Sequence, residues 1–268
     1  MGLGQWFEIG RMDELGRLDT PVHRLDARAK VITTLVFIVV VMSFPRYEVS
    51  ALMPFFIYPF ALIALGHIPP GYISRKILIA APLALAIGMF NPLLDRQTVA
   101  IVGVWSISGG WLSFASIMLR FVLTVSAALA LIACTGIHRL GAGLERMCVP
   151  QVFVVQLLLL YRYLFVVADQ GARMMRSLEL RSAGPRSLRL RVYGSLVGHL
   201  LLRSMNRADR VYRAMVARGF NGEIRVVHRT SFRWTDWAFT GGWITFFAMA
   251  RAWNLADALG RMLTGGGS

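Results

Sequence analysis

Long apolar runs separated by short polar segments dominate the chain. A helix crosses a bilayer with about 20 mostly apolar residues, and several runs approach that length. Glycines and prolines close some of them, because neither residue continues a helix at low cost. The pattern predicts transmembrane helices in five places: residues 31–44 with 27–30 as their first turn, and residues 49–65, 77–94, 112–134 and 234–253.

A sixth apolar run, residues 152–168, is also long enough to span and is broken only by Gln156 and Arg162. The surrounding charge argues against a span, because cytoplasmic segments of membrane proteins carry an excess of Lys and Arg. Residues 135–233 hold 17 arginines against five acidic residues, and 14 of those arginines follow residue 168. We therefore expect five spans, a cytoplasmic N-terminus, and residues 152–168 lying against other helices near the cytoplasmic face.

The basic segment itself predicts two long helices. The first opens at Pro150, a residue favoured in the first helical turn, and runs to about residue 182. The second opens at Ser187, a good N-cap, and is closed after residue 218 by Gly219. Because the link between them is short, the two helices should form a crossed or antiparallel hairpin.

Composition agrees with an all-α, polytopic membrane protein. The chain is 56% hydrophobic and 16% charged, with a mean hydropathy of +0.57, whereas soluble domains average about 45–50% apolar and about 25% charged residues. A net charge of +15 would suggest nucleic acid in a soluble protein, but here it follows the membrane topology, and we expect no nucleic-acid partner. The expected organisation is a cytoplasmic amphipathic segment (1–30), four transmembrane helices (31–135), cytoplasmic helices (136–233), a last transmembrane helix (234–264) and a linker-like tail (265–268).

Two short arginine motifs stand at the C-terminal ends of the two long helices. They are Leu180-Arg181-Ser182 and Ala217-Arg218-Gly219. In an antiparallel hairpin these ends lie tens of Å apart, which suits contact with two subunits of a partner dimer. The alternative is that each arginine only complements the dipole of its own helix, an effect of about 0.3–1 kcal/mol.

Other polar residues offer weaker candidates. Arg120 lies inside an apolar run, where a charge is often functional, although it could equally reach the surface along its own stem. Gln156 and Arg162 are expected to bond to neighbouring helices rather than to a substrate. Cys134 and His138 share a helix face, but a structural metal site normally has four ligands, so we predict no metal site and no cofactor.

Several motifs occur in an order that resembles the transmembrane T component of energy-coupling factor transporters, of the cobalt/nickel type. Residues 20–30 read TPVHRLDARAK, residues 160–163 read LYRY, and the two motif arginines stand 37 positions apart. The resemblance covers residues 10–255. One departure is Leu180, where the family usually has alanine before the first motif arginine.

The resemblance implies a non-catalytic subunit of the cell inner membrane that joins two cytoplasmic ATP-binding cassette ATPases to a substrate-binding membrane subunit. It implies that Arg181 and Arg218 dock in grooves of the ATPases, and that the partner subunit binds the transported metal. Cobalt or nickel is the expected substrate. A vitamin such as biotin is the alternative, because vitamin importers share this scaffold.

Two other classes of function fit the residues poorly. An intramembrane enzyme needs clustered acids for Mg²⁺ or a nucleophile with a base, whereas this chain has only 14 acidic residues and none form a paired-aspartate motif at a membrane surface. A channel or secondary transporter needs polar groups along several spans, and the spans here hold little beyond Arg120.

Overall fold

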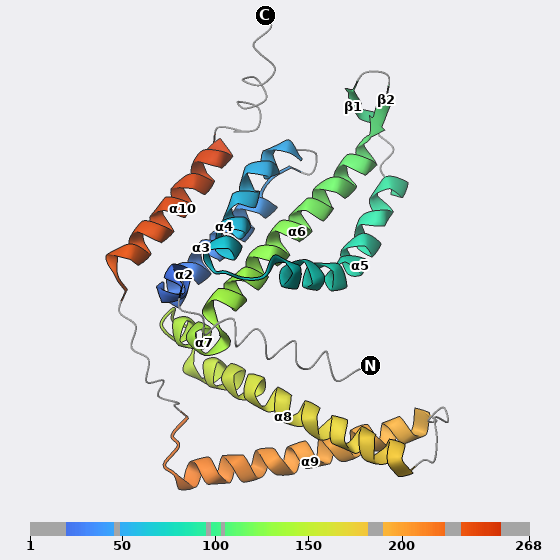
Figure 1. Ribbon diagram of the computed structural model, residues 1–268, viewed down its shortest axis with the longest axis vertical. Coiled ribbons are helices and arrows are strands. Elements are labelled where there is room, and N and C mark those ends of the chain that lie inside the picture. Colours follow the sequence, from blue (N-terminus) through green and yellow to red (C-terminus); the bar gives the residue numbers. More distant parts are fainter. Residues whose placement is uncertain are drawn as a thin grey trace, which may run out of the picture. The chain divides into compact units, whose positions relative to one another are not determined.

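The computed structural model describes residues 20–45, 49–94, 98–102, 105–181, 190–222 and 232–252. The all-α class is confirmed, with one short β-hairpin added (Figure 1). The chain divides into two compact units. The bundle unit comprises the described residues of 12–136 and 230–268, and the hairpin unit comprises those of 137–229.

The bundle unit contains helices at all five places where the apolar pattern predicts them. The short helix α2 (Pro21–Arg24) precedes α3, and Asp26 caps α3 by accepting from the backbone N–H of Arg28. The remaining helices follow the apolar runs to within a few residues at most ends. They are α3 (Ala27–Met42), α4 (Ile57–Leu65), α5 (Pro70–Leu94), α6 (Gly109–Thr135) and α10 (Trp234–Ala252).

Two helices depart from the expected boundaries because of proline. The second apolar run begins as a 3₁₀ helix, η1 (Ser50–Phe56), before α4 continues it. Pro54 lies inside η1 and lacks the N–H that an α-helical turn would use. The third helix starts at Pro70, seven residues before the predicted start at residue 77, because proline is well suited to the first turn of a helix.

A two-stranded hairpin joins α5 to α6 and was not predicted. Strand β1 (Thr98–Val102) pairs antiparallel with β2 (Trp105–Ser108), with Thr98 opposite Ser108 and Val102 opposite Trp105. The β-branched sequence TVAIV favours a strand. Because this run is short and adjoins a long apolar helix, the hydropathy pattern alone does not distinguish the strand from the helix.

An aromatic cluster fills the centre of the bundle unit. Phe37 of α3, Phe55 of η1, Tyr58 of α4 and Phe247 of α10 are fully buried. Ring centroids lie 4.8 Å apart for Phe37 and Tyr58, and 4.9 Å apart for Tyr58 and Trp243. In lipid the hydrophobic effect does not drive helices together, so this interlocking of rings supplies packing that aliphatic lipid tails cannot match.

Three helices of the described chain are long and apolar enough to cross a membrane. They are Pro70–Phe90, Gly110–Thr135 and Gln151–Arg181, and Ser50–Leu65 forms a shorter apolar helix. The chain is therefore a membrane protein. Helix α3 has only 16 residues, or about 24 Å at 1.5 Å per residue, which is less than the roughly 30 Å hydrocarbon core.

The hairpin unit contains three helices: α7 (Ile137–Glu145), α8 (Gln151–Arg181) and α9 (Leu190–Ala217). Helix α7 packs closely on α8, since a Cβ at Gly141 would lie 3.1 Å from Leu158. The two long helices cross, with Leu200 next to Gly171 (Figure 1). The predicted crossed hairpin is confirmed, while the predicted cap at Ser187 lies outside the described residues.

Candidate functional sites

The hairpin holds its two arginine motifs far apart. From the crossing of Gly171 with Leu200, Arg181 lies ten residues, or about 15 Å, along α8. Arg218 lies 18 residues, or about 27 Å, along α9 in the other direction. The two guanidiniums therefore lie at separate ends of the crossed helices.

The Ala217-Arg218-Gly219 motif forms a complete helix C-terminus. The backbone N–H of Phe220 donates to the carbonyl of Met215 at 3.0 Å, and that of Gly219 donates to the carbonyl of Val216 at 2.9 Å. This pair of bonds is a Schellman motif, which needs a left-handed residue after the cap. Gly219 has φ +81° and supplies it.

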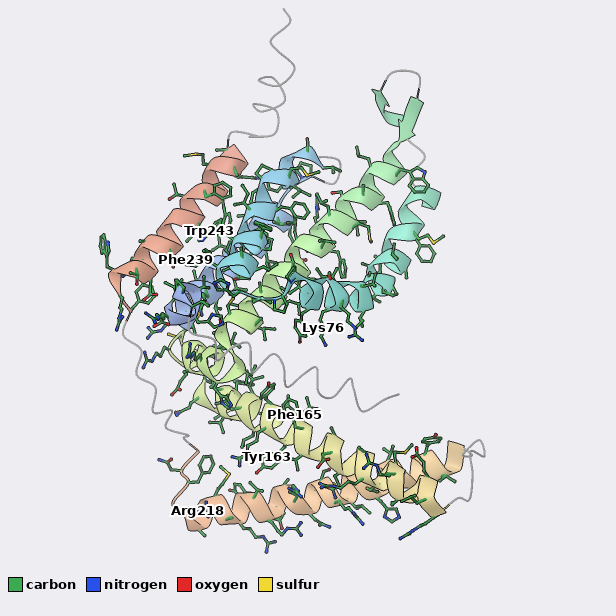
Figure 2. All side chains as sticks on the ribbon, in the orientation of Figure 1. Lys76, Tyr163, Phe165, Arg218, Phe239 and Trp243 are labelled. Atoms are coloured by element: carbon green, nitrogen blue, oxygen red, sulfur yellow. The ribbon has the colours of Figure 1, made fainter. Side chains whose placement is uncertain are left out.

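Because the cap bonds its own carbonyls, Arg218 is not needed to satisfy them. Figure 2 shows Arg218 at the end of α9, and its side chain is exposed. Within the described part of the chain, no carboxylate pairs with it.

The arginine of the first motif, Leu180-Arg181-Ser182, is also exposed at a helix end. Arg181 is the last residue of α8 and is exposed, and Leu180 beside it is 82% exposed. Ser182 lies outside the described residues. Within the described residues, Arg181 therefore makes no ion pair at its helix end.

Two ion pairs of the hairpin unit each join residues within one long helix. Arg173 pairs with Asp169 at 2.6 Å on α8, and Arg213 pairs with Asp209 at 2.9 Å on α9, each four residues apart and exposed. Such pairs contribute about 0.3–0.5 kcal/mol. They leave the motif arginines unpaired among the described residues.

Gln156 and Arg162 are both exposed on α8. The side chain of neither residue makes a hydrogen bond to another described residue. Next to Arg162, the ring of Tyr161 contacts Phe165 at 5.1 Å and His138 of α7 at 6.4 Å. Tyr161 of the LYRY motif thus forms a contact between α7 and α8. The expectation that Gln156 and Arg162 bond to neighbouring helices stays a prediction.

At the N-terminal end of α3, a carboxylate that sequence reasoning missed joins two helices. Asp236 is 3% exposed. Its Oδ1 accepts from the backbone N–H of Asp26 at 2.9 Å, and its Oδ2 accepts from the backbone N–H of Arg233 at 2.8 Å. Asp26 caps α3 and Arg233 directly precedes α10. One carboxylate therefore satisfies donors at two helix N-termini, where negative charge is stabilising.

A buried lysine places a positive charge at the C-terminus of a third helix, α6. Lys30 is 1% exposed, and its Nζ donates to the carbonyl of Cys134 at 3.0 Å, in the last turn of α6. A cation at a helix C-terminus is favourable. The TPVHRLDARAK motif is thus part of a buried polar network, which also includes a 2.6 Å contact between Thr20 Oγ1 and His23 Nδ1.

Arg120 reaches the C-terminal end of α3. Its Nη2 donates to the carbonyls of Phe44 at 3.1 Å and Pro45 at 2.7 Å. Arg251 of α10 donates from Nη2 to the carbonyl of Ser43 at 3.1 Å and lies over the Phe44 ring at 4.3 Å. Both arginines therefore donate to backbone carbonyls at the C-terminal end of α3. Arg120 could be singled out as a charge in an apolar run, whereas no local signal indicated that Arg251 would join it.

No group of three or more metal-ligating side chains occurs among the residues that the structure describes. Cys134 is buried and bonds through Sγ to the carbonyl of Leu62 at 3.6 Å. Its environment is that of a packed core cysteine.

Comparison with known proteins identifies the family. The model of the family CbiQ, cobalt transport protein, matches residues 19–229. The nickel permease LarQ of Lactiplantibacillus plantarum is 32% identical over 181 residues, which cover 62% of this chain and 66% of LarQ. The energy-coupling factor transporter transmembrane protein EcfT of Heliobacterium modesticaldum is 28% identical over 225 residues, covering 76% of this chain and 82% of EcfT.

The cobalt transport protein CbiQ of Rhodobacter capsulatus is 33% identical over 87 residues, covering 32% of this chain and 36% of that protein. These similarities confirm the resemblance carried by the arginine and TPVHRLDARAK motifs. Since the family model spans the bundle helices α2 to α6 and the whole described hairpin, this chain belongs to the CbiQ family of cobalt transport proteins.

Proposed function

We propose that the chain is the T component of an energy-coupling factor importer, joining two cytoplasmic ATP-binding cassette ATPases to a metal-binding membrane subunit. The supporting observation is the pair of exposed, unpaired arginines at separate ends of a rigid helical hairpin. Two separate sites on one body suit a partner that has two copies. Relatives named for cobalt and nickel support those metals as substrates.

Each motif arginine offers five N–H donors in a planar fork, which matches a carboxylate or the carbonyls of a helix end bidentately. In the proposed complex, Arg181 binds one ATPase and Arg218 binds the other. When ATP binding moves the ATPases, α8 and α9 act as levers about their crossing. The hairpin is suited to this because 31- and 28-residue helices transmit displacement with little internal bending.

The chain itself takes no catalytic part in this proposal. Its sequence has no Gly-rich loop ending in Gly-Lys-Ser or Gly-Lys-Thr to cradle phosphates. The purified chain should therefore not hydrolyse ATP, and turnover should appear only after its ATPases are added and should co-elute with the complex. ATP hydrolysis by the isolated chain, retained after removal of contaminating ATPases, would contradict the proposal.

We place the hairpin unit and the N-terminus in the cytoplasm, with five spans in the cell inner membrane. Helix α8 is long and apolar enough to span, but its second half carries Asp169, Arg173, Arg176, Glu179 and Arg181. Burying this half in lipid is costly, since each central charge costs about 2.5–3.5 kcal/mol.

A labelling experiment tests this placement. In a Cys148→Ser background, Arg203→Cys places a thiol on an exposed position of α9. A membrane-impermeant maleimide should leave it unlabelled in intact cells and label it after permeabilisation. Efficient labelling in intact cells would overturn the topology and the docking role together.

The substrate class is separable from the coupling role. Uptake of labelled cobalt, nickel and biotin is measured with the same chain and ATPases, combined in turn with a metal-binding and a biotin-binding substrate subunit. Cobalt or nickel uptake with a metal-binding subunit is the expected result. Biotin uptake alone would favour the vitamin alternative.

A further inference from the structure

Among the described residues, two arginines converge on the C-terminal end of α3, which is more positive charge than a helix end requires. Arg120 from α6 donates to the carbonyls of Phe44 and Pro45, and Arg251 from α10 donates to the carbonyl of the preceding residue, Ser43. A helix C-terminus is equivalent to about −0.5 elementary charge, so one guanidinium already exceeds it. No carboxylate pairs with either arginine within the part of the chain that the structure describes.

Each guanidinium makes its hydrogen bonds to described residues through a single nitrogen, Nη2. Arg120 uses Nη2 for both carbonyls, and Arg251 uses Nη2 for the Ser43 carbonyl and for Ser43 Oγ at 3.3 Å. A guanidinium has five N–H donors, and the Nη1 groups of both arginines make no hydrogen bond to a described residue. The Nε of Arg120 is buried without a partner. Guanidiniums with unused donors can bind the two non-bridging oxygens that share the single negative charge of a phosphodiester.

We propose that Arg120 and Arg251 form a binding site for the phosphodiester of an anionic phospholipid at the C-terminal end of α3. The site is preorganised, because its carbonyl bonds hold both side chains before a ligand arrives. The ligand would compensate the excess charge where a helix end meets the headgroup layer. Anionic phosphate is the shared chemistry, and a free phosphate ion is the other source of it.

Native mass spectrometry of the full chain in mild detergent tests the site. We expect phosphatidylglycerol to bind at least tenfold more tightly than phosphatidylcholine. Arg251→Gln should reduce this preference to less than twofold. The matched control, Arg203→Gln on exposed α9, removes the same charge elsewhere and should leave the preference unchanged.

The choice of variants separates a loss of lipid binding from a loss of folding. Arg120→Gln removes contacts with α3 and could destabilise the bundle, so Arg251→Gln, one residue from the end of α10, carries the test. Ser43→Ala deletes the hydroxyl but keeps both guanidiniums and should retain lipid binding. Equal binding of the two lipids, or equal loss in Arg251→Gln and Arg203→Gln, would overturn the proposal.

Inorganic phosphate separates the two ligand sources. If 10-fold excess phosphate leaves phosphatidylglycerol bound, the lipid is the ligand. Displacement that depends on Arg251 would support an anion site but overturn its assignment to lipid.

Discussion

The bundle unit and the hairpin unit use charged side chains in opposite ways. In the bundle unit, Lys30 and Asp236 are almost fully buried and bond to helix ends within the chain. In the hairpin unit, Arg181 and Arg218 are exposed at helix ends and make no ion pair among the described residues. Charge at a helix end thus fixes the fold in one unit and remains available for partners in the other.

In the topology proposed above, this contrast follows from the surroundings of each unit. A helix end near lipid has no water for its unpaired N–H and C=O groups, so the chain must supply partners. A helix end in water is already solvated, and α9 closes its own end through a Schellman motif. Mutations should therefore affect folding in the bundle and assembly in the hairpin.

The largest expected effect is on assembly. The double variant Arg181→Glu/Arg218→Glu should lose co-purification with the ATPases while the chain stays folded and in the membrane. Losing one partner of a desolvated charge pair costs about 2–5 kcal/mol, and about 3 kcal/mol is already more than a hundredfold in affinity. Each single variant should lose transport first and binding only partially.

The control for this variant is Arg210→Glu, which reverses an exposed arginine within α9. Arg189, an equally plausible control from sequence, lies outside the described residues. Arg210→Glu should leave both pull-down and metal uptake near wild type. If the motif variants behave like Arg210→Glu, the motif arginines only complement their helix dipoles.

The next effect is on stability and tests the bundle side of the comparison. Asp236→Ala leaves the backbone N–H groups of Asp26 and Arg233 without their acceptor. An unsatisfied buried donor costs about 1–3 kcal/mol, so the loss for the two donors should total roughly 2–6 kcal/mol. Denaturant unfolding in detergent measures it.

Asp236→Asn is the matched variant. Its amide has one oxygen that can accept, so it should recover part of the stability that Asp236→Ala loses. Equal stability of wild type and Asp236→Ala would show that this carboxylate does not hold the two helices together.

The sequence predicts the helices better than it predicts the network that joins them. Apolar runs locate α3 to α6 and α10, and Gly219 marks the end of α9, because these signals are local. The bond between Asp26 and Asp236 joins residues 210 positions apart, and that between Lys30 and Cys134 joins residues 104 apart. No pattern in one sequence indicates such pairings.

The same limit applies to the candidate sites. Arg181 and Arg218 could be chosen as candidates because each ends a helix and the spacing matches a family motif. Arg251 could not, since its partners on α3 lie 208 positions away. The β-hairpin of residues 98–108 was missed because its short strands lie next to a long apolar helix.

The smallest expected effect comes from Gly219→Ala and tests whether the docking geometry depends on the helix cap. Gly219 has φ +81°, and a Cβ there would meet nothing within 4 Å, so the substitution acts only through backbone strain. A left-handed non-glycine residue costs about 1–2 kcal/mol. The last turn of α9 should fray and displace Arg218, weakening ATPase binding about five- to thirtyfold, well short of the double reversal. Gly198→Ala, on exposed α9 with nothing within 4 Å, is the matched control and should bind normally, because its backbone is helical. If Gly219→Ala also binds normally, the ATPase recognises Arg218 without needing the capped helix end.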